Sequence, residues 1–353
     1  MAHGLRITIP KLLRIKAGII PKLGKYLASE NMSSIVLLWG EGMEKILGDV
    51  VNSSLAHYQI RVLYSTEVTS IDIRHCFENC LKVPSDTKGI VAIGGGKALD
   101  HAKYLAHNLK IPLMSVPTII SNDGICSSLS SLIVEGKRRT VKTTIPHAVV
   151  VDLDLVSSAP KHFIYSGIGD LVCKGSAIAD WKLAYHQRGE YVDDFAVMMA
   201  QNAFDAFLHF FPKKLDDPNF LKVIVSSLIL IGVAMEIAGS SRPASGSEHL
   251  ISHALDQISK KPHGHGIQVA VASIITSHLQ GEGMDKIVSV LQETGFLDYV
   301  RANPLQRQEL IDAIRLAPSI KTNFYTILSE EQQLAKALAF IGTEPLFKEI
   351  LAE

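Results

Sequence analysis

The first half of the chain alternates short apolar runs with amphipathic, helix-like stretches. Apolar runs occur at residues 34–39, 60–64, 89–93 and 112–116, and helix-like segments separate them, among them residues 42–55 and 98–109. Continuous apolar runs of this length are typical of strands that are buried on both faces. The pattern therefore predicts a parallel sheet flanked by helices.

The second half has a helical period. After a change of pattern over residues 129–152, where the sequence GKRRTVK is interpreted as a turn between two strands of a hairpin, helical periodicity dominates from Pro160 onward. The predicted helices are residues 192–210, 221–238, 267–279, 284–294, 307–316 and 330–338. We therefore predict two domains, an α/β domain over residues 1–157 and an all-helical domain over residues 158–353.

Composition limits the classes of partner. Lys plus Arg and Asp plus Glu balance at 35 each, so no net positive charge would attract nucleic acid or an anionic membrane. The four cysteines lack the spacing of a zinc site or a disulfide framework. The chain also shows neither a leader-like N-terminus nor a long uninterrupted apolar run. We expect a cytoplasmic protein that is not membrane-embedded and whose partner is a small-molecule substrate.

A glycine-rich turn joins the third apolar run to a helix. The sequence IVAIGGGKALDHAK places Gly94, Gly95, Gly96 and Lys97 between them, with Asp100 in the first turn of the helix. Glycine permits positive φ and close approach of a ligand to the backbone, and the free N–H groups of a helix N-terminus attract phosphate. The turn is therefore a candidate site for the diphosphate of a dinucleotide in a Rossmann-like domain. A tight strand-to-helix connection is the alternative.

Polar residues follow the fourth apolar run. In SVPTIISNDGICSS, the residues Thr118, Ser121, Asp123 and Ser127 come directly after a predicted parallel strand. Open α/β sheets bind ligands at the carboxyl ends of their strands. The hydroxyl groups could bond a cofactor and Asp123 a substrate hydroxyl, or these side chains could only satisfy the amides of a turn.

One acidic residue and several histidines in the second half suit a catalytic metal ion. Asp170 follows a Gly-x-Gly sequence and is interpreted as beginning a helix, where an N-cap would also explain it. His249 and His253 lie four apart on one face of a predicted helix, and His263 and His265 precede another. One carboxylate and two imidazoles suit zinc, iron, nickel or cobalt, and three protein ligands leave coordination positions for a substrate.

Five motifs together resemble a known family. GGGKALDHAK, SVPTIISNDGICSSLSS, SGIGDLVCKGSAIADWKLAY, GSEHLISHALD and HGHGIQVAV occur in the order found in the sn-glycerol-1-phosphate dehydrogenases, within the superfamily of iron-dependent alcohol dehydrogenases and dehydroquinate synthase-like enzymes. The resemblance covers residues 10–340 and implies the dehydroquinate synthase-like fold. In HGHGIQVAV, Ile267 stands where relatives often carry Glu.

The resemblance also implies roles for individual residues. It assigns the cofactor NAD or NADP to Gly94, Gly95, Gly96, Lys97, Asp100, Thr118, Ser121 and Ser127, the substrate to Asp123, Asp170 and His253, and a divalent ion to Asp170, His249 and His265. Zinc is the favoured ion, with nickel or iron as alternatives. A homo-oligomer is expected.

The implied reaction is reduction of dihydroxyacetone phosphate to sn-glycerol 1-phosphate for the backbone of phospholipids. His253 is the candidate for proton relay or substrate contact, so Asp170 and His253 are the expected catalytic residues. The substrate phosphate needs cations, for which Lys137, Arg138, Arg139, Lys142 and Lys174 are available. The alternatives are a glycerol or other polyol dehydrogenase, a dehydroquinate synthase-like lyase and a non-catalytic binding protein.

Overall fold

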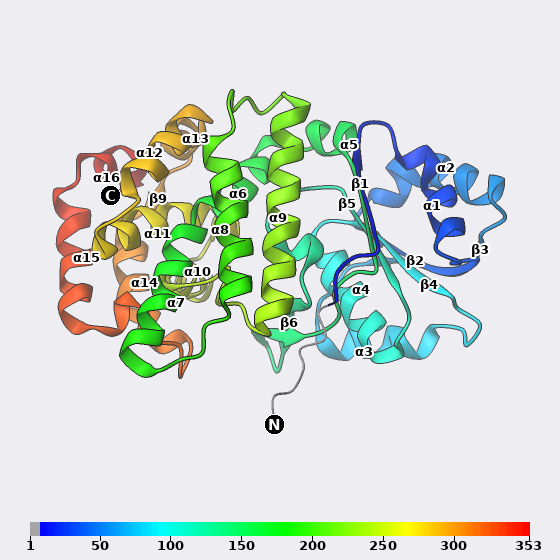
Figure 1. The fold of residues 1–353 in the computed structure, drawn as a ribbon, viewed down its shortest axis with the longest axis horizontal. Coiled ribbons are helices and arrows are strands. Elements are labelled where there is room, and N and C mark those ends of the chain that lie inside the picture. Colours follow the sequence, from blue (N-terminus) through cyan, green and yellow to red (C-terminus); the bar gives the residue numbers. More distant parts are fainter. Residues whose placement is uncertain (1–7) are drawn as a thin grey trace. The chain divides into compact units, whose positions relative to one another are not determined.

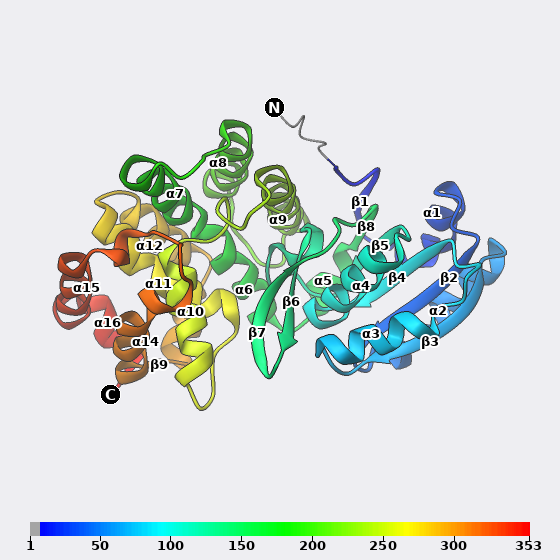
Figure 2. The same ribbon diagram turned by 90° about the horizontal axis from the view of Figure 1, so that it is seen from below.

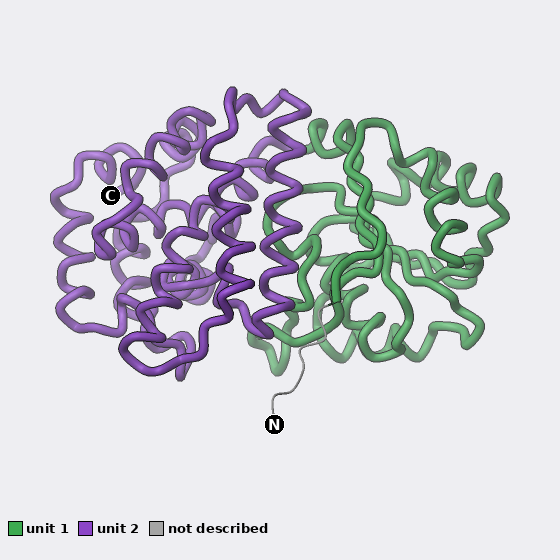
Figure 3. Tube along the Cα trace, viewed as in Figure 1, with its two compact units in different colours: residues 1–159 green, residues 160–353 purple. Residues whose placement is uncertain are grey.

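The computed structural model describes residues 8–353, and the chain divides into two compact units (Figure 3). Unit 1 comprises residues 1–159 and unit 2 residues 160–353.

Unit 1 alternates strands and helices. Its elements are β1 (Leu12–Lys16), η1 (Ile20–Lys22), α1 (Leu23–Ser29), β2 (Ser34–Gly40), α2 (Met43–His57), β3 (Arg61–Val68), α3 (Ile73–Lys82), β4 (Gly89–Gly94), α4 (Gly96–Leu109), β5 (Leu113–Pro117), η2 (Asp123–Cys126), β6 (Leu129–Val134), β7 (Lys137–Lys142), β8 (Ala148–Asp152) and α5 (Leu153–Ser158).

The core of unit 1 is a six-stranded parallel sheet in the order β1-β8-β5-β4-β2-β3. Helices α1 and α2 lie on one side of it, and α3 and α4 lie on the other (Figure 1). Every residue of β2, β4, β5 and β8 is buried, which explains why these strands are uninterrupted apolar runs in the sequence. The prediction of a parallel α/β domain is confirmed.

The predicted hairpin exists, but its turn was placed wrongly. Strands β6 and β7 pair antiparallel around Glu135 and Gly136, which both have positive φ. The stretch KRRTVK is the second strand itself and not a turn. Five of its six residues are exposed, so it lacks the apolar residues by which a strand is recognised.

Unit 2 is built from helices. Its elements are α6 (Lys161–Val172), α7 (Lys174–Arg188), α8 (Asp194–His209), α9 (Pro218–Ala238), α10 (Ser247–Ile258), α11 (His265–Gln280), α12 (Met284–Glu293), α13 (Phe296–Ala302), β9 (Leu305–Gln306), α14 (Arg307–Ile320), η3 (Ile327–Ser329), α15 (Glu331–Thr343), α16 (Pro345–Ile350) and β10 (Leu351–Ala352).

The prediction of a helical second half is confirmed, with the short parallel pair β9 and β10 as a small exception. Among residues 8–353, α9 is the one helix long and apolar enough to cross a membrane by length and composition. However, 72% of its most apolar window is buried within the protein. Burial of this kind is equally found in the core helix of a globular domain.

Candidate metal and cofactor sites

Three helices of unit 2 bring the predicted metal ligands together. Asp170 lies near the end of α6, His249 in the first turn of α10 and His265 at the start of α11. One candidate ligand atom from each residue lies within 4.8 Å of the other two. Asp170 is 1% exposed and His249 7% exposed, so the cluster is largely shielded from water.

A contact between two glycines positions this cluster. A Cβ atom added to Gly169 would lie 1.9 Å from the carbonyl oxygen of Gly266, and one added to Gly266 would lie 1.8 Å from that of Ser166. Helices α6 and α11 can therefore approach this closely only because both residues lack a side chain. Asp170 and His265 are the next neighbours of these glycines, so the contact carries both side chains to one place.

The interpretation of Asp170 as a helix N-cap is wrong. Helix α6 begins at Lys161, and Gly167, Gly169 and Asp170 all lie inside it. Glycine weakens a helix by about 0.5–1 kcal/mol relative to alanine, which is why the Gly-x-Gly sequence was taken for a helix entry. Close packing against α11 is the reason for Gly169 at this position.

The two histidines present the same ring nitrogen to the centre of the cluster. His249 Nδ1 lies 2.9 Å from Glu248 Oε1, and His249 Nε2 lies 3.7 Å from Asp170 Oδ1. Burial, together with the neighbouring His265 and Lys174, lowers the pKa of His249 well below its usual value. A neutral ring that donates its Nδ1 proton to Glu248 has a free lone pair on Nε2, facing the carboxylate of Asp170.

A chain of polar side chains orients His265 in the same way. The hydroxyl of Ser252 donates to Gln268 Oε1 at 2.6 Å, and it lies 3.1 Å from His265 Nδ1. Because its only proton goes to Gln268, the hydroxyl accepts from Nδ1–H of His265, which places the lone pair of the neutral ring on Nε2. Gln268 in turn donates to Asp256 Oδ1 at 3.3 Å.

This donor set fits a divalent ion. Two atoms that are each about 2.1 Å from one ion can be at most ~4.2 Å apart, and the distance of 3.7 Å between His249 Nε2 and Asp170 Oδ1 lies within that limit. It is too long for a hydrogen bond. Histidine rings whose other nitrogen is hydrogen-bonded to a carboxylate or hydroxyl group are the common arrangement around bound metals.

The remaining histidines of the two motifs differ in position. His253 lies one turn after His249, and its ring centre is 5.8 Å from that of His265, so it borders the cluster. His263 bonds to the backbone of Pro304 and is not part of the cluster. Ile267 is buried within α11.

The cations expected to bind a phosphate are differently placed. Lys174 is fully buried, and its ammonium group donates to Asp170 Oδ1 and to the carbonyl oxygen of Ala244, both at 3.1 Å. It therefore belongs to the support of Asp170 and not to a phosphate site. Lys137, Arg138, Arg139 and Lys142 lie on β7, the exposed strand of the hairpin.

In unit 1 the glycine-rich turn lies where the order of strands reverses. Strands β2 and β4 are neighbours in the sheet. From β2 the chain continues to β3 toward one edge of the sheet, and from β4 it continues to β5 toward the other edge. Ligands bind at such a switch point in open α/β sheets. A Cβ atom on Gly94 would lie 2.9 Å from Cα of Gly40, which ends β2. The ends of β2 and β4 thus meet backbone to backbone, which a side chain on Gly94 would prevent.

The turn has the features of a diphosphate site, with one correction. Gly95 is the N-cap of α4, and a Cβ atom on Gly96 would meet nothing within 4 Å, so the N-terminus of the helix is open to a ligand. However, Gly94, Gly95 and Gly96 do not have positive φ, and close approach is the remaining reason for glycine here. Lys97 is an exposed residue that pairs with Glu41 at 3.0 Å.

Asp100 and Ser127 already have partners inside unit 1. Asp100 binds the ammonium group of Lys103 at 2.8 Å and the backbone N–H of Ser131 at 3.1 Å. Lys103 is 1% exposed and also donates to Gly124 O and to the hydroxyl of Ser127. Lys103 therefore ties α4 to the loop that carries Ser121, Asp123 and Ser127.

The other loop residues surround the end of β5. The backbone N–H of Thr118 donates to Gly94 O at 3.1 Å, so Thr118 lies beside the glycine turn. Asp123 begins η2, whose N-cap Asn122 accepts from the N–H of Gly124. Ser121 lies just before this cap and is partly exposed. Thr118 is thus next to the glycine turn, and Ser121 and Asp123 lie farther along the loop.

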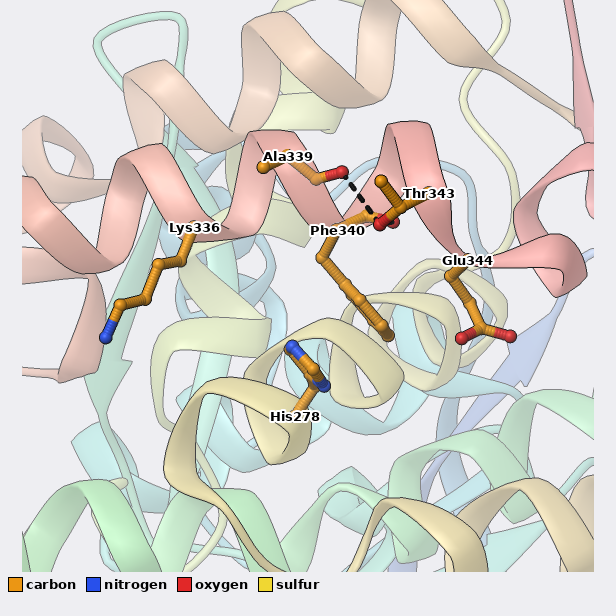
Figure 4. A pocket seen from close by; sticks show the side chains of 6 residues that line it. All are labelled: His278, Lys336, Ala339, Phe340, Thr343 and Glu344. Carbon is orange, nitrogen blue, oxygen red and sulfur yellow. Dashed lines mark hydrogen bonds between the residues drawn. The ribbon is translucent and has the colours of Figure 1, made fainter.

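A hollow of about 430 Å³ lies elsewhere on unit 2, between α11 and α15 (Figure 4). The rings of His278 and Phe340, which both line the hollow, stack with their centres 3.7 Å apart. His278 and His265 are at opposite ends of α11, about 20 Å apart by the rise of a helix. The hollow is therefore remote from the metal cluster.

Several supporting residues escaped prediction from the sequence. Glu248, Ser252 and Gln268 orient the ligand histidines, and Lys103 holds the loop after β5. In the motif GSEHLISH, Glu248 directly precedes His249, and Ser252 lies between His249 and His253. This closeness in sequence to the two histidines was the only available signal for them. The one local signal for Lys103 is its i,i+3 spacing from Asp100, because its other partners lie more than twenty residues later in the chain.

Comparison with known proteins identifies the family. A family model described as iron-containing alcohol dehydrogenase matches residues 14–160. A glycerol-1-phosphate dehydrogenase of Methanosarcina barkeri is 32% identical over 91% of this chain and 90% of its own, and one of Metallosphaera sedula is 35% identical over 93% and 94%. A glycerol dehydrogenase structure from Schizosaccharomyces pombe has a TM-score of 0.76 at 19% identity, covering 96% of this chain and 91% of its own. The chain therefore belongs to the family of glycerol-1-phosphate dehydrogenases.

Proposed function

We propose that the protein is an NAD(P)-dependent, metal-dependent oxidoreductase that reduces dihydroxyacetone phosphate to sn-glycerol 1-phosphate, reversibly. The relatives that carry this name align with nearly the whole chain. The observation that carries the proposal in the structure is the cluster of Asp170, His249 and His265, whose donor atoms lie within 4.8 Å of one another.

The residues of unit 2 would hold the ion and the substrate. We assign Asp170 Oδ1, His249 Nε2 and His265 Nε2 as ligands, with zinc favoured over nickel or iron. When bound, the ion supplies a Lewis acid and the nicotinamide a hydride. Reduction also requires a proton at the substrate oxygen, and His253, which borders the cluster, is the candidate to deliver it or to bind the substrate.

The residues of unit 1 would hold the cofactor. The N–H groups at the start of α4, where Gly96 leaves open space, suit the diphosphate, and Thr118 and Ser121 are the nearby hydroxyl groups. Asp100 and Ser127 support this site through Lys103. Asp123 is assigned to a substrate hydroxyl. NAD and NADP are both retained as cofactors, and a cytoplasmic homo-oligomer is part of the proposal.

One assay tests this function. The protein is stripped of metal and supplied in turn with zinc, nickel or iron. Oxidation of NADH and NADPH is followed with dihydroxyacetone phosphate, and in the reverse direction reduction of NAD+ and NADP+ is followed with glycerol and, separately, with sn-glycerol 1-phosphate. We expect turnover that depends on the ion and favours the phosphorylated substrate. A clear preference for glycerol would instead indicate a glycerol dehydrogenase.

A variant links the assay to the site. The substitution His249→Ala should abolish ion-dependent turnover while circular dichroism shows an intact fold. Full activity of the variant after chelation would contradict the assignment.

A further inference from the structure

A lysine beside the metal cluster has no hydrogen-bonding partner. Lys321 follows the last residue of α14 and is partly buried. Its ammonium group lies 4.6 Å from the centre of the Phe324 ring, and among residues 8–353 it forms no hydrogen bond and no ion pair. An ammonium group has three donors, and the face of one aromatic ring satisfies them only weakly.

The segment that carries Lys321 is held firmly. Arg242 is 1% exposed, and its guanidinium carbon lies 3.6 Å from the centre of the Phe324 ring. Arg242 also binds both carboxylate oxygens of Glu190 and donates to the carbonyl oxygen of Tyr325 at 2.9 Å. The charge of Arg242 is thus neutralised, whereas that of Lys321 is not.

Lys321 lies within electrostatic range of the candidate metal site. Helix α14 packs on α10, which carries His249 and His253. The carboxylate of Glu248, the residue before His249, acts electrostatically on Lys321. Burial and the nearby Arg242 lower the pKa of Lys321 itself. An anion bound to Lys321 would offset the lowering of its pKa by burial and Arg242, and it would accept hydrogen bonds from the ammonium group.

Of the other cations weighed for the substrate phosphate, none has this combination of properties. Lys174 is fully buried against Asp170, and the four basic residues of the hairpin are mostly exposed side chains of unit 1. Lys321 is on the same unit as the metal cluster, contacts the ring of Phe324, and has no hydrogen-bond or ion-pair partner among the described residues.

We propose that Lys321 binds the phosphate group of the substrate and thereby sets the preference for a phosphorylated triose over the free one. The inference rests on the proposed function, because it needs a substrate that carries phosphate. A charge-assisted hydrogen bond to phosphate in a partly buried site is strong enough to change affinity by about tenfold to hundredfold.

The test compares Lys321→Met with Lys321→Arg. Methionine retains the apolar contact with Phe324 but removes the charge, and arginine retains the charge. We expect Lys321→Met to raise the KM for dihydroxyacetone phosphate by about tenfold to hundredfold, with kcat/KM for free dihydroxyacetone changed by less than about twofold. Lys321→Arg should restore part of the affinity. Lys336→Met, in the hollow of Figure 4, is the matched control and should change neither value.

Each outcome has a defined meaning. An unchanged KM for dihydroxyacetone phosphate in Lys321→Met overturns the inference, and so does an equal loss with both substrates. If the methionine variant melts at a lower temperature than the wild type, Lys321→Gln replaces it. If the wild-type protein turns over no dihydroxyacetone phosphate, the proposed function is wrong. In that case, calorimetric titration of the wild type and Lys321→Met with inorganic phosphate decides whether Lys321 binds phosphate, independently of turnover.

Discussion

At the scale of single residues, the candidate metal site depends on side chains that contact its ligands. A histidine can bind a metal through either nitrogen, and the hydrogen bond at the other nitrogen decides which one is available. Glu248 makes this choice for His249, and Ser252 makes it for His265. Burial, together with the nearby charge of Asp180, raises the pKa of Glu248 to about 7. A bound cation next to His249 would favour the charged carboxylate.

Replacing Glu248 should weaken metal binding without removing a ligand. In Glu248→Gln the side chain keeps its size but loses the charge that fixes the Nδ1 proton of His249. We expect affinity for zinc to fall by about 10- to 100-fold, measured by competition with a chromophoric chelator. Glu331→Gln, at an exposed position of α15, is the control. Equal affinities in the wild type and Glu248→Gln would show that Glu248 does not orient His249.

Lys103 offers a corresponding test for the cofactor site. Lys103→Met leaves Asp100 without its cation and frees the loop around Gly124 and Ser127, so the KM for the reduced nicotinamide cofactor should rise about tenfold, equivalent to ~1.4 kcal/mol. Affinity for the metal should be unchanged, because the metal cluster lies entirely in unit 2.

In Lys103→Met the carboxylate of Asp100 is left as an unpaired charge. The double variant Asp100→Asn with Lys103→Met removes that charge, and so it separates the positioning of the loop from the effect of the unpaired carboxylate. A cofactor KM that stays at the wild-type value in both variants would rule out positioning by Lys103. Lys25→Met, on the exposed face of α1, controls for the loss of a positive charge.

At the scale of elements, hydrophobic periodicity predicted most helices and strands, and it failed where an element is polar or packed through glycine. Strands β2, β4 and β5 were predicted because both of their faces are buried. Strand β7 was mistaken for a turn because it is exposed, and the start of α6 was misplaced because Gly167 and Gly169 lie inside it. Neither error could be avoided from the local pattern. Strand β7 is exposed and therefore polar, and the contact of α6 with α11 is made by residues about a hundred positions away in the chain.

The glycine contact between α6 and α11 gives a prediction for Gly169→Ala. The new methyl group would overlap the backbone at Gly266, which cannot move without displacing His265. We expect a loss of about 1–3 kcal/mol or more, seen as a melting temperature lower by several degrees, together with weaker zinc binding. Gly342→Ala in α15 is the matched control, because nothing lies within 4 Å of its Cβ atom. Its stability should be equal or slightly higher. A stable Gly169→Ala variant would contradict the close approach.

At the scale of the whole molecule, stability should depend on pH through a histidine of unit 1. His101 is fully buried, and its Nδ1–H can donate to Ser70 O at 3.2 Å while Nε2 accepts from Asn79 at 3.1 Å. Burial is the main cause that lowers the pKa of His101 to about 4, and the neighbouring His75 adds to it. A second proton on the ring would meet the amide donor of Asn79.

The expected direction follows from proton binding. Because the unfolded chain binds a proton at a pH near 6.5 and the folded chain only near 4, the stabilising effect of neutral His101 is complete above pH 6.5 and is lost as the pH falls toward 4. The free energy of unfolding should fall by about 3 kcal/mol at most through protonation of His101. Urea unfolding at pH 7 and pH 5 should show a smaller difference for His101→Gln than for the wild type. The same pH dependence in both proteins would exclude this role.

The sequence by itself determined the class of fold, the glycine turn after β4 and the types of residue needed for an ion, because strand and helix periodicity and ligand chemistry are local properties. Only the tertiary structure decided that Asp170, His249 and His265 meet and that Glu248 and Ser252 orient the two rings. It also decided that Lys174 is bonded to Asp170, while Lys321 contacts the ring of Phe324 and has no ion-pair partner among residues 8–353. Distances between residues remote in the chain depend on how helices pack, and here that packing depends on two glycines with no side chain at all.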